Sequence, residues 1–223
     1  MQLKHIIFDC DGVLVDSEIV AAQVMVPVLT TLGHAITVNH YLAHYTGKTF
    51  RHIFSQFDID QRVDVDMLIK NVEEKVYQNI KAVEGITDVL EKLDHNKSVV
   101  SNSAMHQITA ALAAIGHTDT FINRFSASQV ANPKPAPDVY EFAMRHIDED
   151  KAHVLVIEDS ISGCTAALAA GLNVVGFCGG KHIMPDHAQK LRNVGVQQIA
   201  SSSVELLSII NKLKKNELAF TSS

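Results

Sequence analysis

Four short, mostly apolar runs set the pattern of this chain, and each is followed at once by polar or glycine residues. The runs are Ile6–Phe8, Ser98–Val100, Val154–Ile157 and Asn173–Phe177. Continuous runs rich in β-branched residues fit strands that are buried on both faces of a sheet. Helical periodicity between the runs predicts helices over Met105–Ile115, Pro137–Ile147 and Ile161–Ala170. Since strands and helices alternate, we expect an α/β core, a Rossmann-like parallel sheet flanked by helices.

The stretch from residue 17 to residue 83 lacks such runs. Its apolar residues instead recur with the period of a helix, at Val20, Val24, Val28 and Leu32 and later at Val65, Leu68, Ile69, Val72 and Val76. This pattern predicts a helical insertion after the first strand. We therefore expect two domains: a Rossmann-like core formed by residues 1–16 and 84–223, and a helical-bundle cap formed by residues 17–83.

Composition narrows the class of protein. The 223 residues are 47% hydrophobic and 20% charged, which is typical of a packed globular protein. The net charge of −6 argues against binding to nucleic acid or to an acidic membrane. No apolar run approaches the ~20 residues needed to cross a bilayer. The three cysteines lack CxxC spacing and no secretory signal is visible, so we expect a cytoplasmic protein without disulfides.

Polar side chains stand at the carboxyl ends of three predicted strands. They are Asp9 and Asp11, Ser101 and Asn102, and Glu158 and Asp159. Ligands of open parallel sheets bind beyond the carboxyl ends of the strands, so the fold should bring these residues together. Four carboxylates at one edge repel one another, and oxygen ligands suit a hard cation such as Mg²⁺. Acidic pairs also occur in exposed turns at strand ends, and Glu158 and Asp159 alone are a weak signal, whereas the two pairs together predict a magnesium site.

Lys134 stands in the segment NPKPAPD, which holds three of the five prolines of the chain. Proline fixes φ and stiffens the backbone, so this segment can hold one lysine in place. A fixed cation beside carboxylates favours a bound anion such as phosphate, the alternative being a solvated lysine in a rigid loop. Ser101 and the amide of Asn102 can also hold phosphate oxygens, unless this turn serves only to cap the next helix through Ser103.

Together these motifs resemble those of the haloacid dehalogenase-like hydrolase superfamily. The segment DCDGVLVDS, which begins at Asp9, is similar to the first motif of that family. Ser101 matches the second motif, Lys134 in KPAPD the third, and Glu158-Asp159 the fourth. All four occur in the order of the family, over nearly the whole chain. Pro133 departs from the pattern, in which glycine often precedes the lysine. The insertion resembles the small cap of the β-phosphoglucomutase-like and phosphatase branch.

The resemblance implies a Mg²⁺-dependent phosphatase that works through an aspartyl-phosphate. Asp9 would be the nucleophile. Asp11 would protonate the leaving alcohol and then activate water. The resemblance implies that Mg²⁺ is held by the side chain of Asp9, the backbone carbonyl of Asp11 and Asp159, with Glu158 binding directly or through water.

The same resemblance implies that Lys134, Ser101 and the Asn102 amide hold the phosphoryl oxygens. In the cap, the segment TGKT around Lys48 resembles a loop that faces the substrate, with a surface lysine on a glycine turn as the alternative. The expected partner is a small phosphorylated metabolite, in particular a sugar phosphate or a sugar-acid phosphate. We expect the chain to act as a monomer or a weak dimer.

Two alternatives remain. Sugar phosphomutases of the same branch place a histidine shortly after the first motif and an arginine in the cap loop, where this chain has Ala21 and Phe50. Arg51 lies one residue away, and Glu18 gives the DSE form that is more typical of phosphatases. The second alternative is a non-catalytic phosphate-binding module, which the presence of every motif residue disfavours.

Two histidines of the predicted cap, His40 and His44, are spaced i, i+4 and can share one face of a helix. A zinc site needs a third ligand at a suitable spacing, and the sequence offers none that is obvious. We therefore expect these histidines to contact substrate or solvent.

Overall fold

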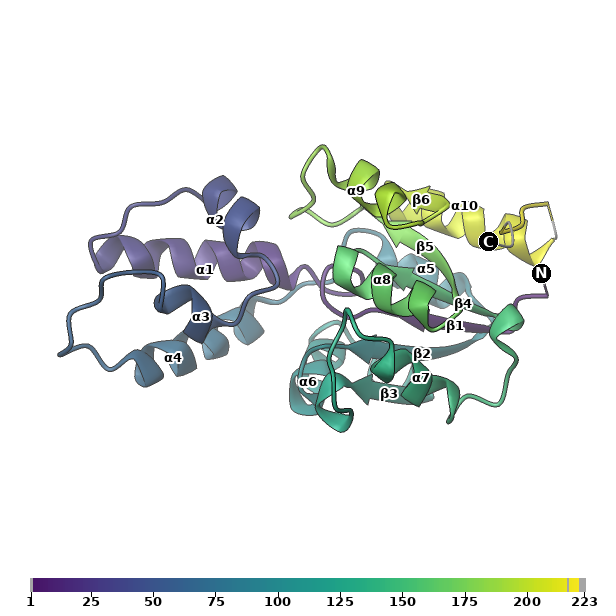
Figure 1. Ribbon diagram of the computed structural model, residues 1–223, viewed down its shortest axis with the longest axis horizontal. Coiled ribbons are helices and arrows are strands. Elements are labelled where there is room, and N and C mark those ends of the chain that lie inside the picture. The colour runs from purple at the N-terminus through teal and green to yellow at the C-terminus, as the bar shows by residue number, and fades with distance from the viewer. Residues whose placement is uncertain (1, 216, 221–223) are drawn as a thin grey trace.

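A computed structural model of the chain describes residues 2–215 and 217–220 (Figure 1). It shows a sheet covered by helices and, beside it, a separate group of four helices. Among the described residues, none of the helices has the length and apolar character that a bilayer crossing requires. The described part of the chain begins and ends at the side of the sheet opposite the four helices.

The sheet has six parallel strands in the order β3-β2-β1-β4-β5-β6. The strands are β1 (His5–Phe8), β2 (Asn96–Ser101), β3 (Asn123–Ser126), β4 (Val154–Glu158), β5 (Asn173–Phe177) and β6 (Gln198–Ala200). In the register of the sheet, Phe8 at the end of β1 lies beside Val99 and Ile157. From β1 the chain forms β2 and β3 on one side of that strand. It then returns to the other side of β1 and forms β4, β5 and β6. The strand order therefore reverses beside β1, which is where open sheets bind ligands.

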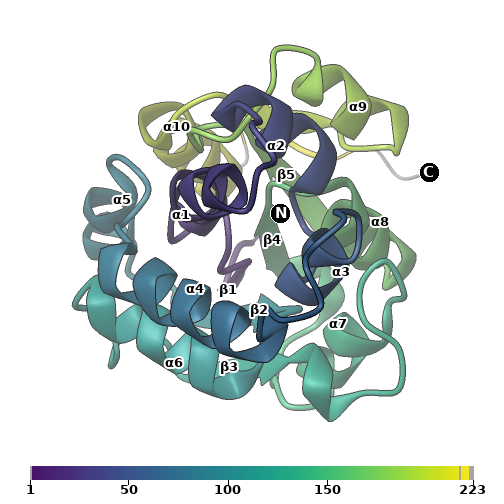
Figure 2. The ribbon, with the colours of Figure 1, turned by 90° about the vertical axis from the view of Figure 1, so that its left-hand side faces the viewer.

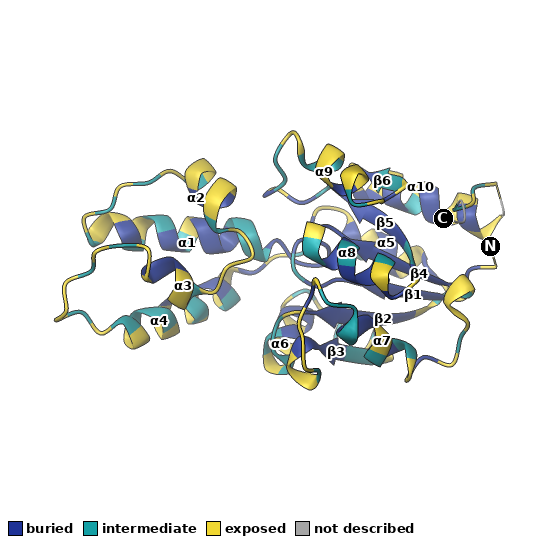
Figure 3. Cartoon of the chain, viewed as in Figure 1, coloured by how far each residue is buried: buried dark blue, intermediate teal, exposed yellow. Residues whose placement is uncertain are grey.

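Helices cover both faces of the sheet. One face packs against α5 (Ile86–Lys92), α6 (Met105–Ala114) and α10 (Ser203–Lys214), and the other against α7 (Asp138–Met144), α8 (Ile161–Ala169) and α9 (His187–Asn193). Along β1, Ile6 and Phe8 belong to the first core and Ile7 to the second, because successive side chains of a strand point to opposite faces. Figure 3 shows the strands buried between the helices. The predicted α/β class is confirmed.

The four remaining helices form the cap. They are α1 (Ser17–Thr31), α2 (Val38–Tyr45), α3 (Phe50–Phe54) and α4 (Val65–Asn79). Their buried side chains belong to the same apolar cluster as one face of the sheet. Figure 2, seen from the side of the cap, shows these helices in front of the carboxyl ends of the strands. All four fall within residues 17–83, and the division of the chain into two domains at these bounds remains our interpretation.

Two short segments connect the cap to the sheet. The Asp16 amide donates to the Lys81 carbonyl at 2.9 Å, and the Val83 amide donates to the Leu14 carbonyl at 3.1 Å. These bonds pair the outgoing and returning segments side by side. The cap is therefore attached at the carboxyl end of β1, next to the acidic residues.

The sequence pattern located β1, β2, β4 and β5 but not the two outer strands, β3 and β6. The outer strands are short and partly exposed, and their sequences, NRFS and QIA, mix polar with apolar residues. An edge strand does not need side chains that are apolar on both faces, so it carries a weaker signal.

We expect Ile157→Ala, in the fully buried centre of β4, to lower the free energy of unfolding by about 2–5 kcal/mol, because the truncation leaves a cavity between packed elements. The matched change Val204→Ala, at a residue that is 82% exposed, should alter it by no more than about 0.5 kcal/mol. Urea denaturation of both variants provides the measurement, and equal losses would contradict the packing of the sheet.

Candidate active site

The loop after β1 brings Asp9 and Asp11 to the edge of the sheet. Asp9 is 6% exposed, and its amide donates to the Ile157 carbonyl of β4 at 2.9 Å. The loop turns at Gly12, whose φ of +84° favours glycine. A Cβ at this position would also lie 2.1 Å from Oδ2 of Asp159. Glycine at this position thus lets the loop approach the end of β4 closely.

Lys134 lies among the carboxylates, as its rigid segment predicted. Its ammonium donates to Oδ1 of Asp9 at 2.5 Å, to Oε2 of Glu158 at 2.8 Å and to the Val100 carbonyl at 3.0 Å. Burial alone would lower the pKa of Lys134, but the carboxylates of Asp9 and Glu158 outweigh it and raise that pKa well above its usual value. The lysine is therefore a fixed, permanent positive charge.

Both oxygens of Glu158 accept hydrogen bonds from protein groups. Oε2 accepts from Lys134 and, at 2.9 Å, from the Tyr140 hydroxyl, whereas Oε1 accepts from the amide and hydroxyl of Ser160 at 3.0 and 2.8 Å. Burial opposes the charge of Glu158, but Lys134 and the two hydrogen bonds from Ser160 lower its pKa. A Cβ at Gly163 would lie 1.9 Å from Oε2, so glycine leaves room for this carboxylate. Glu158 anchors the lysine, and a role as metal ligand remains a prediction.

Asp159 has one oxygen without a partner. Its Oδ2 lies 2.8 Å from Nε2 of His182, whereas its buried Oδ1 meets no hydrogen-bond donor in the part of the chain that the structure describes. Burial, and next the negative charge of Glu158, raise the pKa of both Asp159 and Asp9 well above the usual range. The negative charge of this cluster thus exceeds what Lys134 alone neutralises.

The donor set fits a hard divalent cation. Asp9, Glu158 and Asp159 each offer a carboxylate oxygen, and these oxygens lie within 4.8 Å of one another. They are the only such group of three among residues 2–215 and 217–220. Mg²⁺ prefers oxygen ligands, and the unpartnered Oδ1 of Asp159 is available to it. The predicted acidic cluster is therefore present, and its occupation by Mg²⁺ remains a prediction.

Asp11 accepts hydrogen bonds from three serine hydroxyls. Ser17, the first residue of α1, donates to Oδ1 at 2.7 Å, and Ser101 and Ser103 donate to Oδ2 at 3.1 and 2.7 Å. The alternative that Ser103 caps the next helix is wrong, because the N-cap of α6 is Ala104. The sequence pattern did not indicate that Ser17 and Ser103 lie at the site. The three hydroxyls fix the carboxylate beside the segments that connect the cap to the sheet.

The side chain of Asn102 holds the lysine segment in place. Its Oδ1 accepts from the Lys134 amide at 3.0 Å, and its Nδ2 donates to the Lys134 carbonyl at 3.3 Å. This pair joins the loop after β2 to the proline-rich loop before α7. Contacts of Ser101, Asn102 and Lys134 with phosphate remain predictions.

The cap residues predicted to face the substrate lie apart from the carboxylates. Lys48 is exposed between α2 and α3, with its ammonium 5.8 Å from the centre of the Tyr45 ring. Within the described residues, no hydrogen bond or ion pair joins Lys48 to the acidic cluster. His40 and His44 are exposed with rings 4.4 Å apart, and no third metal-ligating side chain joins them in the described part of the chain.

Glu18 of α1 ties the cap loop to the site. Its Oε1 accepts from the Gly47 amide at 3.1 Å. Burial, together with the nearby charge of Asp11, raises the pKa of Glu18 to about 7. The sequence marked Glu18 only as part of the DSE segment, and the fold places it between the cap loop and the acidic cluster.

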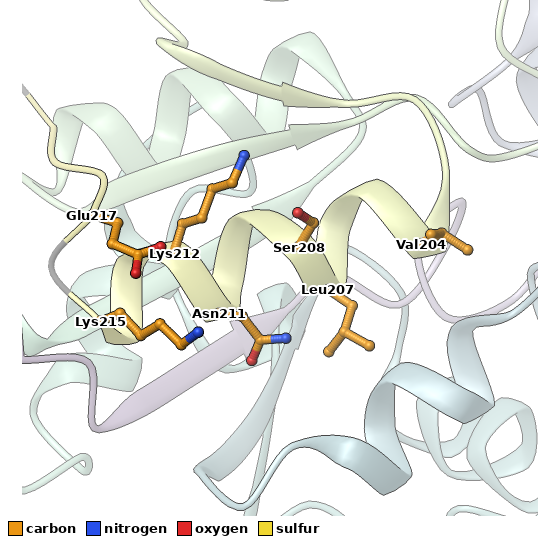
Figure 4. Close-up of a pocket in the computed structure, with 7 residues that line it drawn as sticks. All are labelled: Val204, Leu207, Ser208, Asn211, Lys212, Lys215 and Glu217. Carbon is orange, nitrogen blue, oxygen red and sulfur yellow. The ribbon is translucent and has the colours of Figure 1, made fainter.

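A separate pocket lies along α10 (Figure 4). Its lining residues are Val204, Leu207, Ser208, Asn211, Lys212, Lys215 and Glu217. None of them belongs to the acidic cluster or to its hydrogen-bond partners. This pocket is therefore separate from the acidic cluster at the carboxyl end of β1.

Comparison with known proteins shows similarity to one family of hydrolases. A family model described as haloacid dehalogenase-like hydrolase matches residues 6–177. The 6-phosphogluconate phosphatase of Escherichia coli (strain K12) is 23% identical over 194 residues, which cover 82% of this chain and 86% of that protein.

Two solved structures resemble the whole chain. A haloacid dehalogenase-like protein of Agrobacterium tumefaciens is 32% identical, with a TM-score of 0.81 over 95% of this chain and 99% of the other. A hydrolase of Deinococcus radiodurans R1, solved with bound phosphate and sodium, is 27% identical, with a TM-score of 0.84 over 95% and 96% of the two chains. The resemblance inferred from the motifs thus extends over the cap as well as the core.

We expect Gly163→Ala to lower the free energy of unfolding by about 1–3 kcal/mol, because its methyl group would overlap the fully buried carboxylate of Glu158. The neighbouring change Ser162→Ala adds no atom and should cost less. Urea denaturation measures both. A Gly163→Ala variant as stable as the parent would contradict the position of Glu158 against α8.

The pKa of Glu18 predicts a pH dependence. Because this pKa rises from 4.5 to about 7 on folding, the folded chain binds more protons than the unfolded chain between these values. Stability is therefore lost as the pH rises through this window. We expect Glu18→Gln, in EDTA, to lose less stability than the parent between pH 5 and pH 8. Glu74→Gln, on the exposed side of α4, should follow the parent; parallel curves for Glu18→Gln and the parent would refute the assignment.

Proposed function

This chain belongs to the haloacid dehalogenase-like hydrolase family, as a phosphatase with a small helical cap, and on that premise we propose its reaction and substrate class. It is a Mg²⁺-dependent phosphomonoesterase of the cytoplasm, active as a monomer or weak dimer. Its substrate is a small phosphorylated metabolite, a sugar phosphate or a sugar-acid phosphate. The observation that carries the proposal is the buried ammonium of Lys134 on Asp9, beside the unpartnered oxygen of Asp159.

Asp9 is the proposed nucleophile. Lys134 fixes one of its oxygens, and the buried position of the carboxylate keeps bulk water away from it. A carboxylate oxygen of Asp9 attacks phosphorus, the ester P–O bond breaks, and an aspartyl-phosphate forms. Asp9 and Asp159 would hold Mg²⁺, which, when bound, supplies positive charge against the phosphoryl oxygens. Lys134, Ser101 and the Asn102 amide hold those oxygens, and such positioning accounts for most of the catalysis in phosphoryl transfer.

Asp11 is the proposed proton carrier. The three serine hydroxyls orient its carboxyl group at the mouth of the site. Its proton passes to the oxygen of the leaving alcohol when the ester bond breaks. The resulting carboxylate then takes a proton from the water that attacks the aspartyl-phosphate, and phosphate is released with Asp9 restored.

The proposed substrate class is supported by the relatives. The similar protein of Escherichia coli is a phosphatase of 6-phosphogluconate, a sugar-acid phosphate, and the similar structure from Deinococcus radiodurans holds phosphate. The leaving group would meet the cap, where Glu18, held by the Gly47 amide, places a carboxyl group near the cluster. A polyol chain with many hydroxyls suits such a group.

A phosphatase is favoured over a mutase by the environment of Arg51. This arginine, the nearest candidate for the cap arginine of mutases, forms an ion pair with Asp66 of α4 and is 69% exposed. It therefore points its charge at another cap helix. The buried pair of Lys134 and Asp9 likewise favours catalysis over a module that only binds phosphate.

We expect the parent chain with Mg²⁺ to release phosphate from members of a panel of sugar phosphates and sugar-acid phosphates. Asp9→Asn should lose activity by about a thousandfold or more, because an amide oxygen is a poor nucleophile. The exposed change Asp148→Asn should leave activity unchanged. Free phosphate is measured by a colorimetric assay.

The same reactions distinguish the alternatives. An isomerised sugar phosphate formed with a bisphosphate primer, in place of free phosphate, would indicate a mutase. Undiminished turnover by Asp9→Asn would exclude Asp9 as the nucleophile. Phosphate binding without turnover across the panel would indicate a binding module.

A further inference from the structure

The segment between β5 and α9, residues 178–186, brings to the site a histidine that the proposed reaction does not use. His182 is 7% exposed, and its Nε2 lies 2.8 Å from Oδ2 of Asp159. A carboxylate that binds a cation is ionised and only accepts hydrogen bonds, so in that state Nε2 is the donor. The other ring nitrogen, Nδ1, is buried and meets no partner within the described residues. Among the described residues, the carboxylate of Asp159 is therefore the only hydrogen-bond partner of this imidazole.

Two glycines form the slot that holds the ring. A Cβ at Gly12 would lie 2.8 Å from Cε1 of His182, and a Cβ at Gly180 would lie 2.7 Å from Cε1 and 2.8 Å from Nδ1. Both contacts are shorter than side chains tolerate, so only glycines permit the ring at this place. The imidazole thus packs between its own loop and the loop that carries Asp9 and Asp11, and neither loop leaves it space to turn.

A second histidine from the same region holds the backbone of the same residue. His187, the first residue of α9, lies with its Nε2 2.5 Å from the Asp159 carbonyl. Asp159 is therefore fixed at its main chain by His187 and at its side chain by His182. With Oδ2 occupied in this way, Oδ1 is the oxygen that remains, buried and unpartnered, beside Asp9 and Glu158.

We propose that His182 is a positioning residue of the metal site: it binds Oδ2 of Asp159 and so presents Oδ1 to the cation. The inference rests on the proposed function, since the cation is the Mg²⁺ of that reaction. Residues that do not touch a metal ion can still orient its ligands, because their hydrogen bonds keep a ligating carboxylate from rotating. Loss of such a hydrogen bond typically weakens metal binding by ~10–100-fold. His182 acts through Asp159 and contacts no reacting atom.

The test measures binding of Mn²⁺, as a stand-in for Mg²⁺, to the full chain by calorimetry without substrate. His182→Leu removes the donor. His182→Gln is the matched control, because its amide nitrogen can reach the place of Nε2. We expect the Leu variant to bind Mn²⁺ ~10–100-fold more weakly than the parent and the Gln variant to bind within about threefold of it. Thermal melting in EDTA shows whether each variant is folded.

A Leu variant that binds Mn²⁺ as tightly as the parent would overturn the proposal, and so would a Gln variant as weak as the Leu variant. If the Leu variant does not fold, His182→Asn takes its place, since its shorter amide cannot reach Oδ2. A parent chain that binds no Mn²⁺ would contradict both this proposal and the metal requirement of the proposed reaction. Normal Mn²⁺ binding without phosphate release from any substrate would contradict the proposed reaction alone.

Discussion

The buried contact of Lys134 with Asp9 and Glu158 is the interaction on which the rest of the site depends. It joins β1, β4 and the loop before α7 at one point, with the ammonium 2.5 Å from Oδ1 of Asp9 and 2.8 Å from Oε2 of Glu158. Charges in a protein interior are costly unless they are paired, and breaking a buried pair leaves one charge without compensation. The lysine therefore fixes the relative position of these elements while leaving the cluster with more negative than positive charge, which a divalent cation can offset.

Small residues and local hydrogen bonds allow that contact to form. Gly12 and Gly163 stand where any Cβ would overlap the carboxylates of Asp159 and Glu158. Asn102 binds both the amide and the carbonyl of Lys134, so the backbone of the lysine is held in place beside the cluster. The absence of a side chain at Gly12 likewise leaves room for the ring of His182. Together these contacts restrict the carboxylates at the carboxyl ends of β1 and β4 to one defined arrangement of oxygens.

The attachment of the cap links substrate selection to this arrangement. Ser17, the first residue of α1, donates to Asp11, and Glu18 next to it accepts from Gly47 in the cap loop. Movement of the cap about its two connecting segments would thus shift the donor of a hydrogen bond to Asp11, the proposed proton carrier. Lys48, which the sequence suggested as a substrate contact, lies exposed on that loop, so its role depends on how the cap closes.

The sequence alone predicted the parallel α/β core, the helical insertion, and the gathering of Asp9, Asp11, Lys134, Glu158 and Asp159. It could do so because buried strands leave continuous apolar runs, and parallel strands bring their carboxyl ends to one edge. Only the tertiary structure decided which atoms meet: that Tyr140 and Lys134 bind the same oxygen of Glu158, that Ser103 binds Asp11, and that His182 binds Asp159. These contacts join loops far apart in the chain, and their geometry follows from side-chain packing, for which a linear pattern carries no periodic signal.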